Sequence, residues 1–534
     1  MSTASATLPP SSFLSRLHCT GAIARADFVM RLRAPRFWIV LGLLIVATCL
    51  FFPGPDGVFT TAAINGHYRS DYSSAWIGML IGLLDALLLS LAGFYVIRGT
   101  VVRDIDTRVW QLLVTTTMTR RSYLFAKWCS HLAVLLLMAL LSLAVGLAMQ
   151  WLRAEDRHFD LVEAFKPLLL IALPALALTA TAAIWFDLLP PLRRTAGSVL
   201  FFIVWIAAIS VGTASRDSWK DPHAGSGFVN DPVGMVVFLR ELTRSVAPQL
   251  PEKQIDSFCL GCGEKAGEDT GRFVWKRWDP RSLDIVGRAF WFAMALAAVA
   301  AAAPLLDWAA KRAGSAVEAS GKKVPRNRPL KLITRALAPL QHSLLGRMVS
   351  AELLLVLRQR RILWWLALIV LGVLQITTPK DVAGLPICLT WLLSLDLLAH
   401  AALRDVQTGT RELIFTAAGA TWRALRSRAL VVLAMILLGT LPALIRFSFA
   451  APGMALAIAV IAVSITAWGI AFGTLFGNAR AFEIVFCLLT YHALNGGAIL
   501  NVSIDPLGSA VWHAALLPAA LALSLWRWPR LVRV

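Results

Sequence analysis

The sequence has few charged residues and none of the short motifs that mark common enzyme classes. Charged residues make up 15% of the 534 residues, hydrophobic residues make up 58%, and the mean hydropathy is +0.68. So few charges could not cover so much apolar surface in a globule, and composition therefore excludes an ordinary soluble protein. The chain also contains no GxxxxGKS or GxxxxGKT phosphate loop, no HExxH, no GxSxG and no Cys/His cluster with zinc spacing. We therefore expect no enzyme activity, and no metal or cofactor bound by this chain.

Long apolar runs are what the sequence has in abundance. A run of about twenty residues crosses about 30 Å of hydrocarbon as a helix, and twelve such runs fall into two groups of six. The sequence predicts an all-α, polytopic integral membrane protein of about 12 transmembrane helices, arranged as two six-helix repeats with amphipathic surface helices and one large external loop. The predicted spans are 37–52, 74–97, 128–151, 167–186, 196–212, 284–309, 362–378, 384–403, 429–445, 454–476, 482–500 and 507–526.

The spans group into two halves joined by a basic segment. The first six-span half covers 1–320 and carries the external loop at 213–283, the cytoplasmic linker covers 321–344, and the second half covers 345–534. A basic, partly apolar segment precedes the first span of each half, which is typical of a helix lying on a membrane surface. The two segments match at an offset of 325, so that Asp27 pairs with Glu352, Arg33 with Arg358 and Arg36 with Arg361.

A polar stretch after the second span of each half repeats without a gap. The first copy runs from Arg103 to Lys127 and the second from Arg404 to Arg428, at a constant offset of 301. The identical positions are Arg103, Asp104, Thr107, Leu112, Thr115 and Leu124, which recur as Arg404, Asp405, Thr408, Leu413, Thr416 and Leu425. Leu113 with Ile414 and Lys127 with Arg428 keep the chemistry. Because both copies occupy the same place in their halves, we interpret them as repeats.

Charge indicates how the spans are oriented. The formal net charge is +20, and the Lys and Arg residues near span ends fall on one side if both termini are cytoplasmic. The basic residues are dispersed among the spans, so a nucleic-acid partner is not expected. We expect a multi-pass protein of a bacterial cytoplasmic (inner) membrane, because the sequence is rich in Ala, Leu and Arg, with the lipid bilayer as one partner.

The repeated stretches carry a resemblance to a known family. RDVQTGTRELIF followed by RALRSRA, and RDIDTRVWQLLV followed by RRSYLFAK, resemble the cytoplasmic segment of type-2 ABC exporter permeases. The family usually has Gly where the first copy has Arg108, and both copies lack a Pro before the basic exit. The resemblance implies the transmembrane (permease) subunit of an ABC exporter, with two permease halves fused in tandem.

The resemblance also implies partners. Each repeated stretch would contain a coupling helix that docks on an ATPase subunit, so two ATPase copies are expected, and ATP and Mg would be bound by those subunits. The coupling residues would be Arg103, Asp104, Leu112, Leu113, Arg404, Asp405, Leu413 and Ile414. Substrate would then cross by alternating access driven by those ATPases.

Ionisable residues inside predicted spans are further candidates, because charge in hydrocarbon is costly unless it faces a cavity or a partner. Asp85 lies in the second span, and Asp396 and His400 lie in the eighth. We expect these three to line a transport pathway or to pair inside the bundle. Both interpretations stay open at the level of sequence.

The external loop contains the only closely spaced cysteine pair, Cys259 and Cys262. A disulfide between them is the favoured interpretation outside the cytoplasm, with metal binding or thiol exchange as the alternative. The loop also contains DPVGMVVFLRELTRSVA, expected on the outer membrane surface, and Trp275 and Trp278, expected as interfacial anchors. A periplasmic or accessory protein is the partner expected there.

Two other functions stay open. The first is an ion-coupled secondary transporter in which Asp85 or Asp396 carries a proton. The second is a membrane enzyme or assembly factor whose chemistry lies in the external loop with Cys259 and Cys262. The first predicts transport driven by a pH gradient without ATP, whereas the exporter interpretation predicts that an ATPase co-purifies.

Overall fold

The computed structural model is mostly helical and divides into two compact units, Met1–Gly321 and Lys322–Val534. Helices dominate because the backbone of a long apolar segment has no water nearby to form hydrogen bonds with. In a helix, the backbone N–H and C=O groups form hydrogen bonds with one another. The structure describes residues 13–53, 60–66, 68–107, 109, 118–153, 155–193, 195–214, 231–251, 255, 257–262, 271–309, 331–360, 362–408, 410, 415, 419–494 and 496–532.

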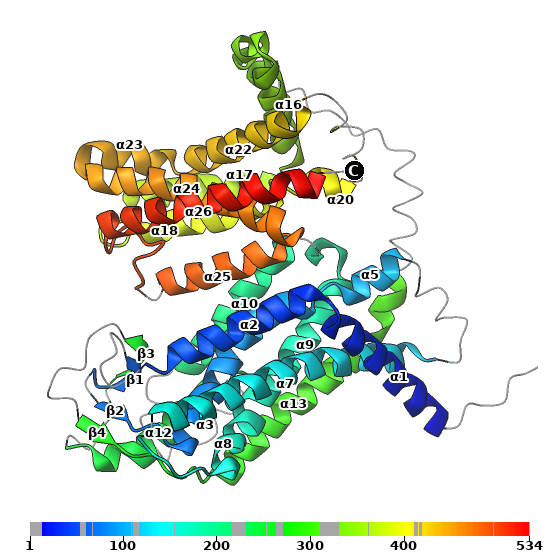
Figure 1. Ribbon diagram of the computed structural model, residues 1–534, viewed down its shortest axis with the longest axis vertical. Coiled ribbons are helices and arrows are strands. Elements are labelled where there is room, and N and C mark those ends of the chain that lie inside the picture. The colour runs from blue at the N-terminus through cyan, green and yellow to red at the C-terminus, as the bar shows by residue number, and fades with distance from the viewer. Residues whose placement is uncertain are drawn as a thin grey trace, which may run out of the picture. The chain divides into compact units, whose positions relative to one another are not determined.

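Unit 1 is a helical bundle with a small sheet at one end (Figure 1). Its helices are α1 (Phe13–Leu32), α2 (Pro35–Phe51), α3 (Ser74–Leu84), η1 (Asp85–Leu89), α4 (Ser90–Ile97), α5 (Thr100–Asp106), α7 (Arg120–Arg153), α8 (Leu161–Pro167), η2 (Leu168–Ala172), α9 (Leu173–Leu188), η3 (Pro190–Leu192), α10 (Thr195–Ala214), α12 (Met235–Val246), η5 (Ala247–Gln249) and α13 (Ser282–Ala301). The long helix α7 packs against α1, α2, α3, α9 and α13, and α9 also contacts α4. The core of unit 1 therefore lies around α7 and α9.

The sheet joins two loops that are far apart in sequence. Strands β1 (Thr60–Ile64) and β2 (Tyr68–Ser70) follow the first predicted span, and β3 (Phe258–Cys262) and β4 (Gly271–Phe273) follow the fifth. The strand order is β3-β1-β2-β4, in which β1 is antiparallel to β2 and β3, and β2 is parallel to β4. Sequence analysis predicted no strand here. Two loops that pair in one sheet must lie on the same side of a membrane.

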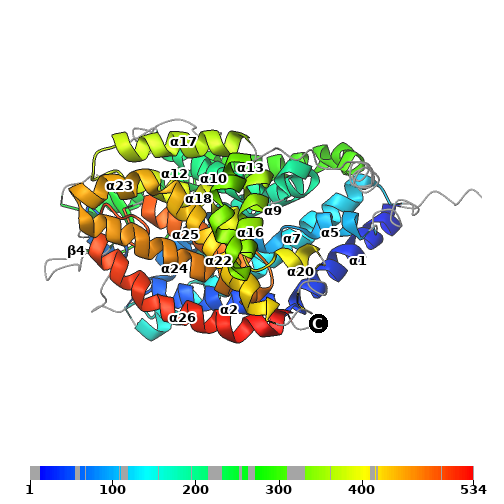
Figure 2. The same cartoon turned by 90° about the horizontal axis from the view of Figure 1, so that it is seen from above.

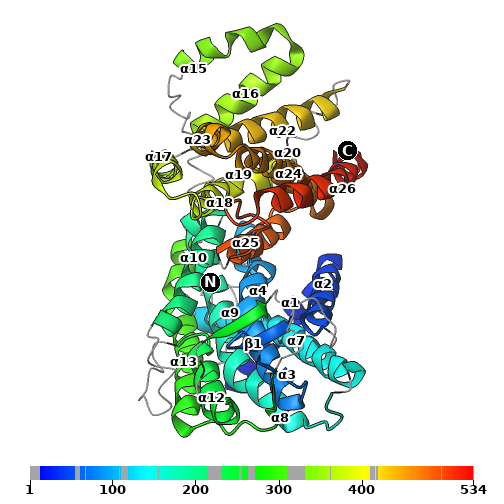
Figure 3. The ribbon, with the colours of Figure 1, turned by 90° about the vertical axis from the view of Figure 1, so that its left-hand side faces the viewer.

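One prediction about the external loop was wrong. Trp275 and Trp278 are only 2% and 1% exposed, and Trp76 packs against Trp275 and Phe273 with ring centroids 5.8 and 5.3 Å away. They are buried inside unit 1 and are not surface anchors. Helix α12 likewise buries most of its side chains and packs on α3 and α10. Helix α12 lies at the end of the unit that also holds α8 and the sheet (Figure 3).

Unit 2 repeats the order of the helices without the sheet in the part of the chain that the structure describes. Its helices are α15 (Lys331–Ala336), η6 (Ala338–His342), α16 (Leu344–Gln359), α17 (Ile362–Thr377), α18 (Gly384–Leu393), α19 (Leu395–His400), α20 (Arg404–Thr408), α22 (Ala420–Gly439), α23 (Leu441–Ala450), α24 (Pro452–Phe476), α25 (Arg480–Leu494) and α26 (Pro506–Val532). Helix α24 lies against α19, α22 and α26 (Figure 2). In the same way, α9 contacts α4, α7 and α13 in unit 1.

Six helices among the described residues are long and apolar enough to cross a membrane, or up to eight if two bent pairs each form one span. The six are Ser74–Asp106, Arg120–Arg153, Leu161–Leu188, Ser282–Ala309, Pro452–Phe476 and Pro506–Leu531. The bent pairs are α16 with α17, and α22 with α23, where the bend is 64°. Shorter apolar helices occupy Val40–Phe51, Thr195–Val211 and Gly384–Leu393. These helices fit a membrane protein, and the count of twelve spans stays a prediction.

Candidate functional site: two charge clusters

The coupling residues predicted from the repeat lie partly in well-described helices. Arg103 and Asp104 belong to α5, and Arg404 and Asp405 begin α20. The four apolar residues of the prediction, Leu112, Leu113, Leu413 and Ile414, lie outside the described residues. The site is therefore built from the charged members and the side chains that they contact.

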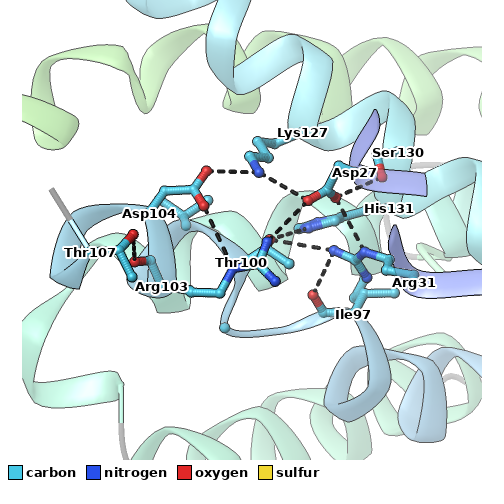
Figure 4. A network of polar contacts seen from close by, with 12 residues as sticks. Asp27, Arg31, Ile97, Thr100, Arg103, Asp104, Thr107, Lys127, Ser130 and His131 are labelled. Carbon is cyan, nitrogen blue, oxygen red and sulfur yellow. Dashed lines mark hydrogen bonds and ion pairs between the residues drawn. The ribbon is translucent and has the colours of Figure 1, made fainter. Parts of the chain in front are cut away.

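Asp27 is the centre of a cluster in unit 1 (Figure 4). Its carboxylate, on α1, is 3% exposed and forms ion pairs with Lys127 at 3.0 Å, Arg31 at 3.2 Å and Arg103 at 3.6 Å. The Ser130 hydroxyl donates a hydrogen bond to it at 2.8 Å. Arg103 comes from α5 and Lys127 from α7. One carboxylate thus holds three separate helices together.

Asp104 completes the cluster from the side of α5. Lys127 Nζ lies 2.8 Å from its carboxylate, and the Tyr123 hydroxyl donates to the same group at 2.8 Å. Lys127 therefore bridges Asp27 and Asp104. A buried lysine between two carboxylates is satisfied, whereas the same lysine without them would be a costly buried charge.

The charges of this cluster fix the ionisation of Asp27. Burial opposes ionisation, but the charges of Arg31 and Lys127 and the hydrogen bonds of Ser130 and Lys127 outweigh it and hold the pKa of Asp27 well below its usual range. A lowered folded pKa contributes stability above the unfolded value of about 3.9, and this contribution is lost as pH falls toward the folded pKa. Asp27 therefore stays ionised at neutral pH and into the mildly acidic range.

The start of α5 is held from the opposite side by Asp187, which directly follows the fourth predicted span. Its carboxylate accepts hydrogen bonds from the backbone N–H groups of Gly99, at 2.8 and 3.0 Å, and Val101, at 3.3 Å. Gly99 has a φ of +90°, a left-handed conformation that favours glycine. Arg31 reaches the same turn by donating to the Ile97 carbonyl at 3.1 Å. The connection from the second span to α5 is thus fixed at both ends.

Unit 2 contains the same arrangement. Glu352 on α16 forms ion pairs with Arg404 of α20 and with Arg428 of α22, the latter at 3.4 Å. Arg428 also forms an ion pair with Asp405. Arg428 takes the bridging position, and one of its buried nitrogens, Nη1, has no hydrogen-bond partner among the described residues.

Three ion pairs of unit 1 recur in unit 2 between residues that the sequence repeat makes equivalent. The recurring pairs are Asp27 to Arg103 with Glu352 to Arg404, Asp27 to Lys127 with Glu352 to Arg428, and Asp104 to Lys127 with Asp405 to Arg428. The repeat predicted which residues correspond. It did not predict that Asp27 or Glu352 contacts the polar stretch. The segment that holds these two residues repeats at an offset of 325, whereas the polar stretch repeats at an offset of 301, so the two were not linked. The signal was present in the matching acidic residues, Asp27 and Glu352.

The candidate pathway residues occupy different surroundings. Asp85 is 3% exposed, and its carboxyl oxygens both lie 3.0 Å from the Ser142 hydroxyl of α7. The Asp396 side chain is 40% exposed and forms an ion pair with Arg360 at 2.9 Å. His400 Nδ1 lies 3.4 Å from the Asp396 carboxylate. Because Arg360 lies between α16 and α17, Asp396 sits at one end of its bundle, whereas Asp85 lies within a span.

The cysteines separate into two groups. Cys259 in β3 is disulfide-bonded, whereas Cys19, Cys49, Cys129, Cys388 and Cys487 are free. The side chain of Cys262, the expected partner, lies outside the described residues. Strand β3 pairs with β1, with Cys259 opposite Ala63, so the disulfide belongs to the sheet.

The two clusters consist of ion pairs that join helices. Among the residues that the structure describes, no three His, Cys, Asp or Glu side chains are grouped to hold a metal ion. What the clusters can do is transmit force, since each joins a surface helix, a short polar helix and a long apolar helix. No model of a known family, no curated protein and no solved structure matches this chain.

Proposed function

We propose that this protein is the transmembrane permease subunit of an ABC exporter, with two six-span halves in one chain. The observation that supports it is the pair of equivalent charge clusters, each of which ties together the two ends of a repeated stretch that resembles the coupling segment of type-2 permeases. A short polar helix that is tied by ion pairs to two longer helices moves with them. An ATPase that grips such a stretch would therefore shift the spans behind it.

The proposed topology has both termini in the cytoplasm and twelve spans in a bacterial inner membrane. Disulfides persist in oxidising compartments, so the Cys259 disulfide supports an external position for the sheet. The charge cluster of unit 1 lies at the other end of the same helices, since α7 runs from Lys127 near its start to Arg153 beside the loops of the outer end. That position is cytoplasmic, where ATP and Mg would be bound by the two partner ATPases.

The test is retention of the ATPase on the permease. Leu112 and Leu113, and separately Leu413 and Ile414, are replaced by Asp, and the amount of ATPase that co-purifies with each variant on pull-down is compared with the wild type. Each double variant should retain several-fold less ATPase, because a charged pair would disrupt an apolar contact. The matched control is Ile504→Asp, which adds a charge to a half-exposed loop position on the proposed outer side.

Two results bear on the rival functions. If both double variants insert normally and retain the ATPase in full, the repeated stretches are ordinary loops and the proposal fails. A secondary transporter is favoured by the buried carboxyl of Asp85 within a span. Transport that follows a pH gradient, and continues with a hydrolysis-deficient ATPase, would replace the exporter proposal with that one.

A further inference from the structure

Asp85 lies at the middle of the second predicted span, where the helix changes its hydrogen-bond pattern. The π-helical segment η1 begins at Asp85, inside the helical run that α3, η1 and α4 form from Ser74 to Ile97. At 1.5 Å per residue, Asp85 is about 18 Å from Ser73 at one end and about 20 Å from Arg98 at the other. An ionised carboxylate at such a depth in hydrocarbon costs several kcal/mol unless a partner compensates it.

The hydrogen-bond geometry around Asp85 indicates which protonation state is satisfied. The Ser142 Oγ lies 3.0 Å from both carboxyl oxygens and 2.9 Å from the carbonyl oxygen of Ala139. A hydroxyl has one proton to donate. If Asp85 is ionised, the one proton of Ser142 can go either to the carboxylate or to the Ala139 carbonyl, which already accepts a backbone bond within α7, but not to both. If Asp85 is protonated, it donates to Ser142 and Ser142 donates to Ala139, so that all three groups are bonded.

No cation on the described elements around η1 compensates a negative charge at Asp85. The elements that contact η1 or bond to it are α3, α4, α7, α9, α10 and η2, of which α3, α10 and η2 carry no titratable side chain. The titratable residues on the other three are Tyr95, Arg120, Arg121, Tyr123, Lys127, Cys129, His131, Arg153 and Asp187. On α7, His131 and Arg153 are the nearest to Ser142, and each is about three turns, or about 16 Å, along the helix.

The π-helical segment also links the second span to the fifth. The Trp205 indole N–H of α10 lies 3.1 Å from the Leu87 carbonyl oxygen and 3.1 Å from the Ser90 hydroxyl. Segment η1 contacts η2, a second π-helical segment at the start of the fourth predicted span. π-Helical turns in longer helices are frequent at functional sites. Asp85 thus lies where the second and fourth predicted spans both contain π-helical turns. The fifth predicted span donates a hydrogen bond to the same segment of the second.

We propose that Asp85 is a proton-binding site within the membrane. In this packed arrangement it carries a proton, which it donates to Ser142, and the packing of η1 against α7 keeps the carboxyl away from water. The proton can leave only when the second and third spans separate enough to hydrate the carboxylate. This inference does not depend on the ATPase partnership, because it rests on the contacts within unit 1 alone.

The first test is infrared spectroscopy of the purified protein at pH 7, which detects the carbonyl stretch of a protonated carboxyl group. The expected result is that Asp85→Asn loses one such band, whereas the control Asp396→Asn does not, because Asp396 is half-exposed and paired with Arg360. Ser142→Ala should shift the band, because it removes the acceptor of the proton. If the spectrum of Asp85→Asn keeps every protonated-carboxyl band of the wild type, the proposal is wrong.

The second test is the pH dependence of stability in detergent between pH 6 and 9. The folded protein keeps the proton of Asp85, whereas the unfolded chain releases it above about pH 4, so stability falls as pH rises. Relative to Asp85→Asn, the unfolding equilibrium constant of the wild type should increase by up to tenfold per pH unit. A difference between the two proteins that is independent of pH would overturn the proposal. If Asp85→Asn does not fold, the band shift in Ser142→Ala decides the question.

Discussion

Lys127 and Arg103 contact the same carboxylate, Asp27, from very different surroundings. The Lys127 side chain is 5% exposed and bridges two carboxylates, whereas the Arg103 side chain is 44% exposed. Exposed ion pairs contribute about 0 to 1 kcal/mol because water screens them and the side chain loses freedom. Removing one partner of a buried pair costs about 3 to 5 kcal/mol, because the other charge stays buried. The extent of burial, and not the number of contacts, therefore decides which of the two residues contributes more to stability.

This ranking predicts a difference between two similar substitutions. Lys127→Met should destabilise unit 1 by about 3 kcal/mol, because Asp27 and Asp104 would then face each other without their shared cation. Arg103→Met should cost less than about 1 kcal/mol. The measurement is the unfolding midpoint of each purified variant in the same detergent. Equal losses would contradict the central position assigned to Lys127.

At the scale of elements, close helix packing depends on a few glycines. Gly469 and Gly473 lie one turn apart on the face of α24 that meets α19, and a Cβ at Gly469 would lie 2.7 Å from the Leu398 carbonyl oxygen. Gly453, on the same helix, would place its Cβ no nearer than 3.6 Å, against the flexible side chain of Leu507. Small residues that let backbones approach are typical of helix contacts in membranes.

The different surroundings of Gly469 and Gly453 on the same helix give a matched pair of variants. Gly469→Ala should destabilise unit 2 by about 1 to 3 kcal/mol, because backbone atoms cannot yield as a side chain can. Gly453→Ala, near the start of the same helix, should be neutral or slightly stabilising. Thermal unfolding of the two variants, compared with the wild type, checks the prediction. A loss of stability in Gly453→Ala as large as that in Gly469→Ala would contradict it.

Hydrophobic patterning predicts the long helices well and their irregularities poorly. The runs around α7, α9, α24 and α26 were found from sequence because a long apolar segment can satisfy its backbone only as a helix. The π-helical turn at Asp85 has no comparable signal, since it depends on Ser142 and Trp205 of other spans. Strands β1 to β4 were missed because each is only three to five residues long and pairs across a large separation in sequence. Local patterns cannot show pairing at that range.

At the scale of the whole chain, the loops of unit 1 form two groups. The loops after the first, third and fifth predicted spans contact one another, and the loops after the second and fourth contact each other. Arg69, after the first predicted span, pairs with Glu155, after the third, at 2.8 Å. Glu163 of α8 accepts a hydrogen bond from the backbone N–H of Trp278, after the fifth, at 2.9 Å. Asp187, after the fourth, bonds to Gly99, after the second. This alternation is what a chain crossing a membrane repeatedly would produce.

Cysteine labelling checks the proposed orientation. Cys19 on α1 is free and exposed, and Cys259 is disulfide-bonded. In intact cells, a membrane-impermeant maleimide should label neither until an impermeant reductant opens the disulfide, after which Cys259 reacts. Cys19 should react only after the membrane is permeabilised, with Cys19→Ser as the control. Labelling of Cys19 in intact cells would reverse the assignment of the two sides.

The pairing of β1 with β3 has a consequence for biosynthesis. Asn65 accepts a hydrogen bond from the backbone of Ser257, which is 192 residues away, whereas Lys127 reaches Asp27 across 100 residues. At about 5 to 20 residues per second, the ribosome separates the two ends of the cluster by about 5 to 20 s and the two strands by about 10 to 40 s. The charge cluster around Asp27 can therefore close while β1 is paired with β2 alone and still lacks β3. The four-stranded sheet is completed only after β3 and β4 have been made, late in the synthesis of this unit.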